Sequence, residues 1–190
     1  MIDFASAHKL KVRDIKVVKG RGEKHGNAFI AGVVPGMRFI YLTDYLVDNL
    51  SSDELKAVVA HEIGHGKRHH LWIKLGTPLL VTLILFGVLF LVDAMGFLSD
   101  RTEGLVLAVP LVTFVGLVVA WGKMGNRFEH SADDYAADAV GVDVTIRSLE
   151  KLAEMNMAKR NTGRIFNILT QHPSLDLRIE RLRKRAVTTA

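Results

Sequence analysis

The segment Val59-Ala60-His61-Glu62-Ile63-Gly64-His65 stands in the middle of a stretch with strong helical signals. Ser51 is followed three residues later by Glu54, a capping-box pattern that predicts where a helix begins. Apolar residues then recur at helical spacing, at Leu55, Val58, Val59 and Ile63. We therefore expect one helix from Ser51 to about His70, with both histidines of the segment inside it.

His61 and His65 are four residues apart, which places them about 40° apart on one helix face. Both imidazoles can then reach one ion, and zinc prefers histidine nitrogen and carboxylate oxygen in a tetrahedral site. Glu62 lies beside them, where its carboxylate can take a proton from water. Because the H-E-x-x-H pattern falls within a capped helix, a zinc site with Glu62 as general base is favoured over two histidines that share a helix by chance.

A catalytic zinc site needs a third protein ligand, and Glu129 is the candidate. Asp133 is four residues further on, so it shares the same helix face and could hydrogen-bond a liganding imidazole. His130 and Asp134 are alternative third ligands, although each lies off that face. A solvated acidic surface is the other interpretation of these residues.

The composition of the 190-residue chain narrows the choice of metal ligands and partners. It contains no cysteine, which excludes disulfides and leaves histidine and carboxylates as metal ligands. Its net charge is +5, but no finger spacing or helix-turn-helix pattern appears, so we expect no nucleic-acid partner. Basic residues beside apolar segments fit an anionic membrane surface better.

Two runs of the sequence carry no charged residue, residues 75–92 and residues 104–121. Each is close to the roughly 20 residues that cross a hydrocarbon layer of about 30 Å. Trp72 and Trp121 stand at matching ends of the two runs, where interfacial tryptophan is common. We expect a transmembrane hairpin and a lipid bilayer as partner; a pair of buried helices in a soluble protein is the alternative.

Basic residues flank the two runs on the same side, and the link between the runs is net acidic. The flanking basic residues are Lys67, Arg68, Lys74, Lys123 and Arg127. The positive-inside rule therefore predicts an integral membrane protein whose chain ends and histidine motif face the cytoplasm. Residues 1–13 lack an apolar core, so no signal peptide is expected.

The remaining pattern predicts a mostly helical α+β fold with a small N-terminal sheet. The expected strands are Ile15–Val18, Asn27–Val34 and Arg38–Leu42, and the expected helices are Asp3–Leu10, Arg127–Val140, Val144–Met157 and Leu175–Arg185. We expect residues 1–190 to form a single domain, with the two apolar runs inserted between the two halves of the zinc site.

The other histidines are less informative. His69 and His70 fall near the end of the motif helix, where histidine is expected to interact with the last carbonyl groups. His8 and His25 are expected on the surface. His172 precedes Pro173 at a helix break and is either an electrophilic donor to the reacting carbonyl or a turn histidine.

Five stretches occur in an order that matches a known family. They are Gly26-Asn27-Ala28-Phe29, Ser51-Ser52-Asp53-Glu54-Leu55, Val59-Ala60-His61-Glu62-Ile63-Gly64-His65, Arg127-Phe128-Glu129-His130-Ser131-Ala132-Asp133, and His172-Pro173 with Arg178-Ile179-Glu180-Arg181-Leu182. A chain with these stretches resembles the integral-membrane zinc metallopeptidases of the gluzincin type, which include the bacterial heat-shock membrane protease and the CAAX prenyl endopeptidases.

The resemblance implies a gluzincin-like catalytic core with one zinc ion per chain. It implies that His61, His65 and Glu129 bind the zinc, that Glu62 is the general base, and that Asp133 orients a ligand. It favours the catalytic interpretation of His172, and Asn27 matches a position next to the active-site sheet. The relatives carry further membrane spans, a departure that puts CAAX processing in doubt more than peptide hydrolysis.

These observations predict a zinc endopeptidase that acts on membrane or membrane-associated polypeptides. We expect the substrate to bind extended, as an added strand along Arg38, Phe39, Ile40, Tyr41 and Leu42. Two alternatives stay open: a non-catalytic zinc-binding membrane protein, and a soluble minimal protease with its apolar hairpin buried.

Overall fold

The computed structural model describes residues 1–20, 25–32, 34–96, 103–156 and 174–189. The described helices are α1 (Ile2–Ala7), α2 (Asp44–Asn49), α3 (Ser52–Lys67), α4 (His70–Ala94), α5 (Glu103–Val140), α6 (Val142–Met155) and α8 (Leu175–Thr189). The strands are β1 (Val12–Val18), β2 (Ala28–Ala31) and β3 (Arg38–Thr43). The expected class, mostly helical with a small N-terminal sheet, is confirmed.

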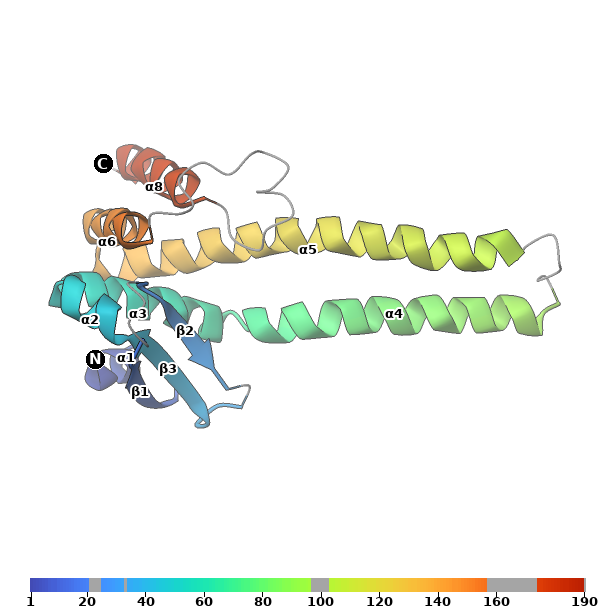
Figure 1. The fold of residues 1–190 in the computed structure, drawn as a ribbon, viewed down its shortest axis with the longest axis horizontal. Coiled ribbons are helices and arrows are strands. Elements are labelled where there is room, and N and C mark those ends of the chain that lie inside the picture. The colour runs from blue at the N-terminus through green and yellow to red at the C-terminus, as the bar shows by residue number, and fades with distance from the viewer. Residues whose placement is uncertain (21–24, 33, 97–102, 157–173, 190) are drawn as a thin grey trace.

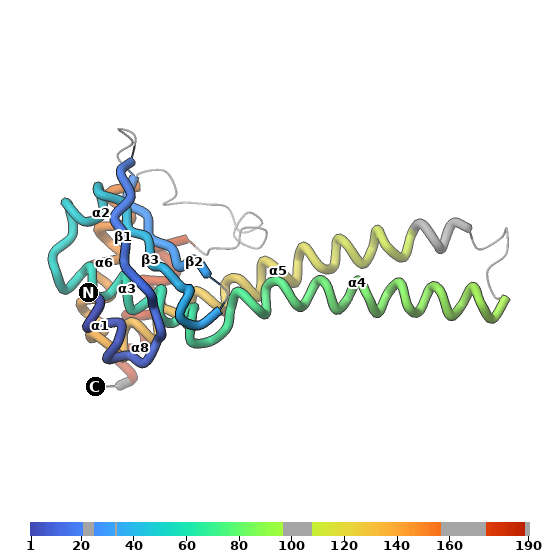
Figure 2. The backbone as a smooth tube through the Cα atoms, turned by 90° about the horizontal axis from the view of Figure 1, so that it is seen from below, coloured from blue at the N-terminus to red at the C-terminus, as the bar shows by residue number. Residues whose placement is uncertain are grey.

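The molecule has a globular end and a long extension. The sheet, α3, α6, α8 and both chain ends lie at the globular end, while α4 and the first half of α5 extend from it side by side (Figure 1). Figure 2 shows the same arrangement after a quarter turn. We call α4 and the first half of α5 the helical pair.

The sheet is ordered β1-β3-β2, with β3 parallel to β1 and antiparallel to β2. Ile40 and Leu42 alternate with half-buried residues along β3 and belong to the main core, which also contains Val59 and Ile63 of α3. Because β3 is the central strand, its main chain is bonded on both sides. The expectation that a substrate pairs along Arg38, Phe39, Ile40, Tyr41 and Leu42 is therefore wrong, and the outer edge next to α3 belongs to β2.

Helix α3 begins as its capping box predicts. The Ser51 hydroxyl accepts from the Glu54 backbone N–H at 3.4 Å, and the Glu54 carboxylate accepts from the Ser51 N–H at 2.8 Å. The helix ends at Lys67, three residues before the expected position, because His69 adopts a left-handed conformation with φ of 54°. A new helix, α4, begins at His70.

Helix α5 is longer than expected. Arg127–Val140 was predicted as a separate helix after the second apolar run, but α5 runs without interruption over 38 residues. Gly122 and Gly125 stand between the two parts, and glycine weakens a helix without ending it. The apolar run and the Glu129 region are consequently parts of one rigid helix.

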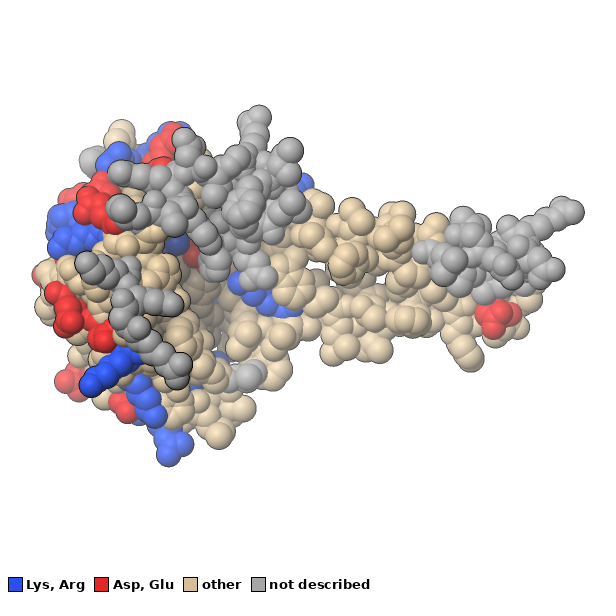
Figure 3. Space-filling view, in the orientation of Figure 1, with Lys and Arg blue, Asp and Glu red and all other residues tan. Residues whose placement is uncertain are grey.

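Most described apolar side chains of the helical pair are exposed. Two described helical segments are long and apolar enough to cross a membrane; none of the apolar window of the first is buried, and 11% of that of the second. Phe86 and Phe90 are 65% and 70% exposed, and Val112 is 70% exposed. Figure 3 shows charged residues gathered over the globular end and absent from the middle of the helical pair. The alternative of a buried hairpin is therefore wrong for the described residues.

Candidate metal centre

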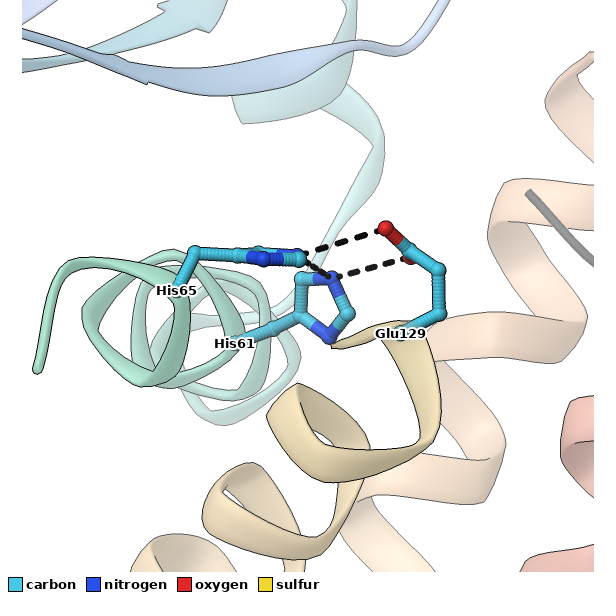
Figure 4. A group of neighbouring side chains, drawn as sticks. All are labelled: His61, His65 and Glu129. Atoms are coloured by element: carbon cyan, nitrogen blue, oxygen red, sulfur yellow. Dashed lines mark hydrogen bonds and ion pairs between the residues drawn. The ribbon is translucent and has the colours of Figure 1, made fainter. Parts of the chain in front are cut away.

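Three side chains from two helices converge at the globular end. His61 and His65 extend from α3 and Glu129 from α5, and Figure 4 shows their polar atoms facing one another. His61 Nε2 lies 3.1 Å from His65 Nε2. Glu129 contributes one carboxylate oxygen 3.4 Å from His61 Nε2 and the other 3.4 Å from His65 Nε2.

These separations fit a tetrahedral metal site. Zinc bonds of about 2.0–2.1 Å to nitrogen and oxygen imply about 3.3 Å between neighbouring ligands of a tetrahedron. The two histidine nitrogens are 3.1 Å apart, and each lies 3.4 Å from a different oxygen of the Glu129 carboxylate, so all three separations are close to that value. Two imidazoles and a carboxylate are also a donor set that zinc accepts, with one position left for water or substrate. The residues present therefore fit a zinc ion.

Gly64 allows the two helices of the site to come close together. A Cβ atom built on Gly64 would lie 3.1 Å from the Cα of Ala132 and 3.1 Å from the Cβ of Tyr135. Both contacts are with α5, so α3 and α5 pack closely at the middle of the histidine motif. This approach brings Glu129, one helical turn before Ala132, to the two histidines.

Glu62 lies beside the site and faces the edge of the sheet. Its carboxylate accepts a hydrogen bond from the backbone N–H of Ile30 in β2 at 3.0 Å. Burial and the neighbouring charge of Glu129 raise the pKa of Glu62 to about 7, against the opposing effect of His61. A carboxyl group whose pKa is near neutrality can both accept and return a proton.

Asp133 lies behind His61, as the spacing on α5 predicted. Its Oδ1 is 2.9 Å from His61 Nδ1, the ring nitrogen that does not face Glu129. Burial alone would lower the pKa of His61, but the hydrogen bonds with Asp133 and Glu129 raise it to about 9. Asp133 is 1% exposed, and Arg178 holds its pKa below the usual range despite the opposing effect of burial.

Arg178 also belongs to the site, although sequence analysis assigned it no role. It lies in the first turn of α8, is 8% exposed, and contacts both carboxylates of α5. Its Nε and Nη2 donate to Asp133 at 2.8 and 2.5 Å, and its Nη1 lies 3.3 Å from Glu129. The sequence offered only indirect evidence for it. Two buried carboxylates need a cationic side chain nearby, but the sequence does not identify which arginine or lysine provides it.

The alternative third ligands, His130 and Asp134, are not part of the group of converging side chains. Asp134 pairs with Arg181 at 2.5 Å and with Arg185 at 3.0 Å. Neither Asp134 nor His130 belongs to the ligand group found among the described residues. His172 lies outside the described residues, so its role stays a prediction.

His70 lies in a different environment from the one expected. It was assigned to the carbonyl groups at the end of the motif helix, but it is 4% exposed and its Nδ1 lies 2.8 Å from His65 Nδ1. Burial and the positive charges around it, those of His65, Arg68 and Lys74, lower its pKa to about 4. His69 is exposed, and its expected interaction with the last carbonyl groups stays a prediction.

A cavity of about 850 Å³ opens over the site. Its walls contain the two motif histidines, Glu62 and Glu129, together with residues of β2, α6 and α8. Asn27 and Arg38 line the cavity. The other residues of the predicted substrate strand, Phe39, Ile40, Tyr41 and Leu42, are not among its described lining residues. The cavity therefore connects β2 with His61, His65 and Glu129.

Comparison with known proteins shows which family the chain resembles. The family model of peptidase family M48 matches residues 1–186. A protease HtpX homolog of Neisseria meningitidis is 28% identical over 174 residues, covering 83% of this chain and 62% of the relative. A CAAX prenyl protease 1 homolog of Arabidopsis thaliana is 28% identical over 193 residues, covering 95% of this chain and 45% of the relative.

The crystal structure of S. mikatae Ste24p shares the fold, with a TM-score of 0.71 and 23% sequence identity. The match covers 95% of this chain and 48% of that one. This chain thus spans less than two thirds of the length of these relatives. Because the family model covers nearly the whole chain, the protein belongs to peptidase family M48.

Proposed function

We propose that this chain is a zinc-dependent endopeptidase, with one zinc ion held by His61, His65 and Glu129. The observation that carries the proposal is the convergence of His61, His65 and Glu129, whose potential ligand atoms lie 3.1 to 3.4 Å apart, beside the half-buried carboxylate of Glu62. A purely structural zinc site would have no need of the Glu62 carboxylate beside it. Membership of a peptidase family supports the same conclusion.

Each residue around His61, His65 and Glu129 has its own proposed role in the reaction. Zinc bound there would supply a Lewis acid for the peptide carbonyl and for a water molecule. Glu62 takes the proton of the attacking water and returns it to the leaving amine, a double use that its pKa of about 7 favours. Asp133 holds His61 in one ring orientation, and Arg178 compensates the charge of Asp133. His172 is proposed as a donor to the developing oxyanion.

The substrate is proposed to bind extended along the outer edge of β2. Ile30 N–H points away from β3, because it donates to Glu62 at the site. Along a strand, the main-chain groups of every second residue point to the same edge. Ala28, two residues before Ile30, therefore also points its N–H and C=O away from β3. A polypeptide added at this edge would place its scissile bond next to Glu62, and main-chain pairing predicts broad sequence preference.

The helical pair is proposed to cross a membrane as a hairpin inserted between the two halves of the zinc site. Its uncharged runs, residues 75–92 and 104–121, are each about 27 Å long as helices, close to the hydrocarbon thickness. The flanking basic residues favour a cytoplasmic active site. Residues 1–190 would then form a single gluzincin-like domain whose substrates are membrane or membrane-associated polypeptides.

The experiment is zinc analysis combined with a casein-cleavage assay on the purified chain in detergent. The proposal expects one zinc per chain, cleavage that stops with a chelator, and neither zinc nor cleavage after His65→Ala. A chain that holds one zinc but cleaves no polypeptide would instead support a non-catalytic zinc-binding membrane protein.

A further inference from the structure

His70 lies behind His65, on the side of that imidazole turned away from the proposed zinc site. The Nε2 atom of His65 faces His61 and Glu129. Its other ring nitrogen, Nδ1, is 2.8 Å from Nδ1 of His70. His70 therefore contacts the nitrogen of His65 that the metal does not use.

This contact determines where the protons are. A neutral His65 that offers the lone pair of Nε2 to a metal carries its proton on Nδ1. Two Nδ1 atoms at 2.8 Å share one hydrogen, so His70 Nδ1 has to be the acceptor. The ring of His70 then carries its own proton on Nε2, which faces Ser131 Oγ at 3.4 Å.

The ring of His70 lies between the start of α4 and the second half of α5. His70 is the first residue of α4. Its ring stacks on Phe128 of α5, with centroids 4.1 Å apart and planes 10° apart. Ser131, also on α5, accepts a hydrogen bond from Arg68. The acceptor for His65 is thus fixed at the junction of the metal site and the base of the helical pair.

The two histidine ligands differ in what lies behind them. His61 has a carboxylate, Asp133, at its second ring nitrogen, with 2.9 Å between the atoms. His65 has the imidazole of His70 there instead. We propose that His70 is a positioning residue: it accepts the Nδ1–H of His65 and so makes His65 present its Nε2 lone pair to the metal. The inference rests on the proposed zinc site and assigns His70 no contact with substrate.

Zinc affinity measured by competition with a chromogenic chelator tests the role, using the full chain in detergent with Glu62→Gln to prevent self-cleavage. His70→Leu removes the acceptor and should weaken zinc binding by about 10- to 100-fold. His70→Asn keeps an acceptor oxygen and should stay within about threefold of the parent. His69→Asn removes an exposed histidine from the same junction and should leave the affinity unchanged.

Packing and hydrogen bonding are separated by Phe128→Leu. This change removes the stacking partner, so it should lower the melting temperature while zinc affinity changes less than in His70→Leu. A His70→Leu chain that binds zinc as tightly as the parent would overturn the proposal. So would a His70→Asn chain that loses as much affinity as His70→Leu, because the ring would then matter only for packing.

Nitrogen-15 NMR of the histidine-labelled, zinc-loaded parent needs no substitution in the junction. The proposal expects protons on His65 Nδ1 and on His70 Nε2; a proton on His70 Nδ1 would overturn it. A parent chain that binds no zinc contradicts the proposed function, and this inference with it. If the parent binds zinc but the affinity comparison and the NMR measurement both give the contrary result, only the role of His70 is contradicted.

Discussion

Arg178 donates two hydrogen bonds to the carboxylate of Asp133, from Nε at 2.8 Å and from Nη2 at 2.5 Å. Both side chains are buried, and Asp133 in turn holds His61. The pair therefore ties the last helix of the fold to the proposed metal ligands. A bidentate arginine–carboxylate pair has a geometry that lysine cannot reproduce.

Replacing Arg178 should be costly because it leaves Asp133 buried without its partner. We expect Arg178→Met to lower the free energy of unfolding by about 3–5 kcal/mol and Arg178→Lys by less. Arg183→Met is the matched control on the same helix, since its pair with Glu150 is exposed, and it should change stability by less than about 1 kcal/mol. Unfolding in detergent, followed by circular dichroism, measures both; equal effects of the two methionine variants would contradict this account.

Gly64→Ala tests whether the close approach of α3 and α5 forms the site. Alanine favours a helix by about 1 kcal/mol over glycine, but the new Cβ would lie 3.1 Å from the α5 backbone, and overpacking typically costs about 1–3 kcal/mol. We expect α5 to move outward and zinc affinity to fall about tenfold. Gly76→Ala in α4 meets nothing within 4 Å and should not weaken zinc binding. If Gly64→Ala binds zinc as tightly as the parent, the close approach at Gly64 is not needed to form the site.

The pH dependence of stability should show the contribution of Glu54. Burial alone would raise its pKa, but the hydrogen bonds from Lys151 and Ser51 lower it from 4.5 to about 2. The folded chain thus binds fewer protons than the unfolded chain between these pH values. The stabilisation is fully present above pH 4.5 and is lost as the pH falls toward 2.

Glu54→Gln should therefore destabilise the chain at neutral pH, by about 1–2 kcal/mol, and flatten the acid limb of the stability curve. Asp53→Asn, an exposed neighbour in the same helical turn, is its control and should leave that limb in place. Chemical unfolding at pH values from 2 to 7 distinguishes them. A Glu54→Gln curve parallel to that of the parent would mean that Glu54 does not titrate as described.

Removal of the metal should destabilise the fold, because the proposed zinc would be bound by two helices that are far apart in the sequence. Zinc at 100 times its dissociation constant stabilises a folded protein by about 2.7 kcal/mol. A chelator should lower the melting temperature of the parent, and added zinc should restore it. His65→Ala should melt at the same temperature with and without zinc; a zinc-dependent shift in that variant would place the metal elsewhere.

Local signals predicted the parts of the structure that depend on local interactions. The capping box fixes the start of α3 through contacts between Ser51 and Glu54 alone. The four-residue spacings that put His61 beside His65, and Glu129 in line with Asp133, follow from helical geometry. These calculations need no knowledge of the tertiary fold, and the structure brings the four side chains together.

The features that sequence analysis did not predict depend on tertiary contacts. The order of the strands depends on pairing between segments that are distant along the chain, so β3 was mistaken for an edge. Arg178 reaches Asp133 from 45 positions away, and no local pattern distinguishes it from its basic neighbours. His70 follows a helix end, and only the left-handed His69 turns it back toward His65.

The central claim is that Glu62 works on a peptide bond at a zinc site built by its neighbours. Parent and Glu62→Gln chains, purified in detergent, can be compared for bound zinc and for the rate of casein cleavage in the same preparations. We predict one zinc per chain in both, with cleavage by the variant reduced on the order of 10²- to 10⁴-fold. A zinc-loaded Glu62→Gln chain that cleaves casein as fast as the parent would contradict the account.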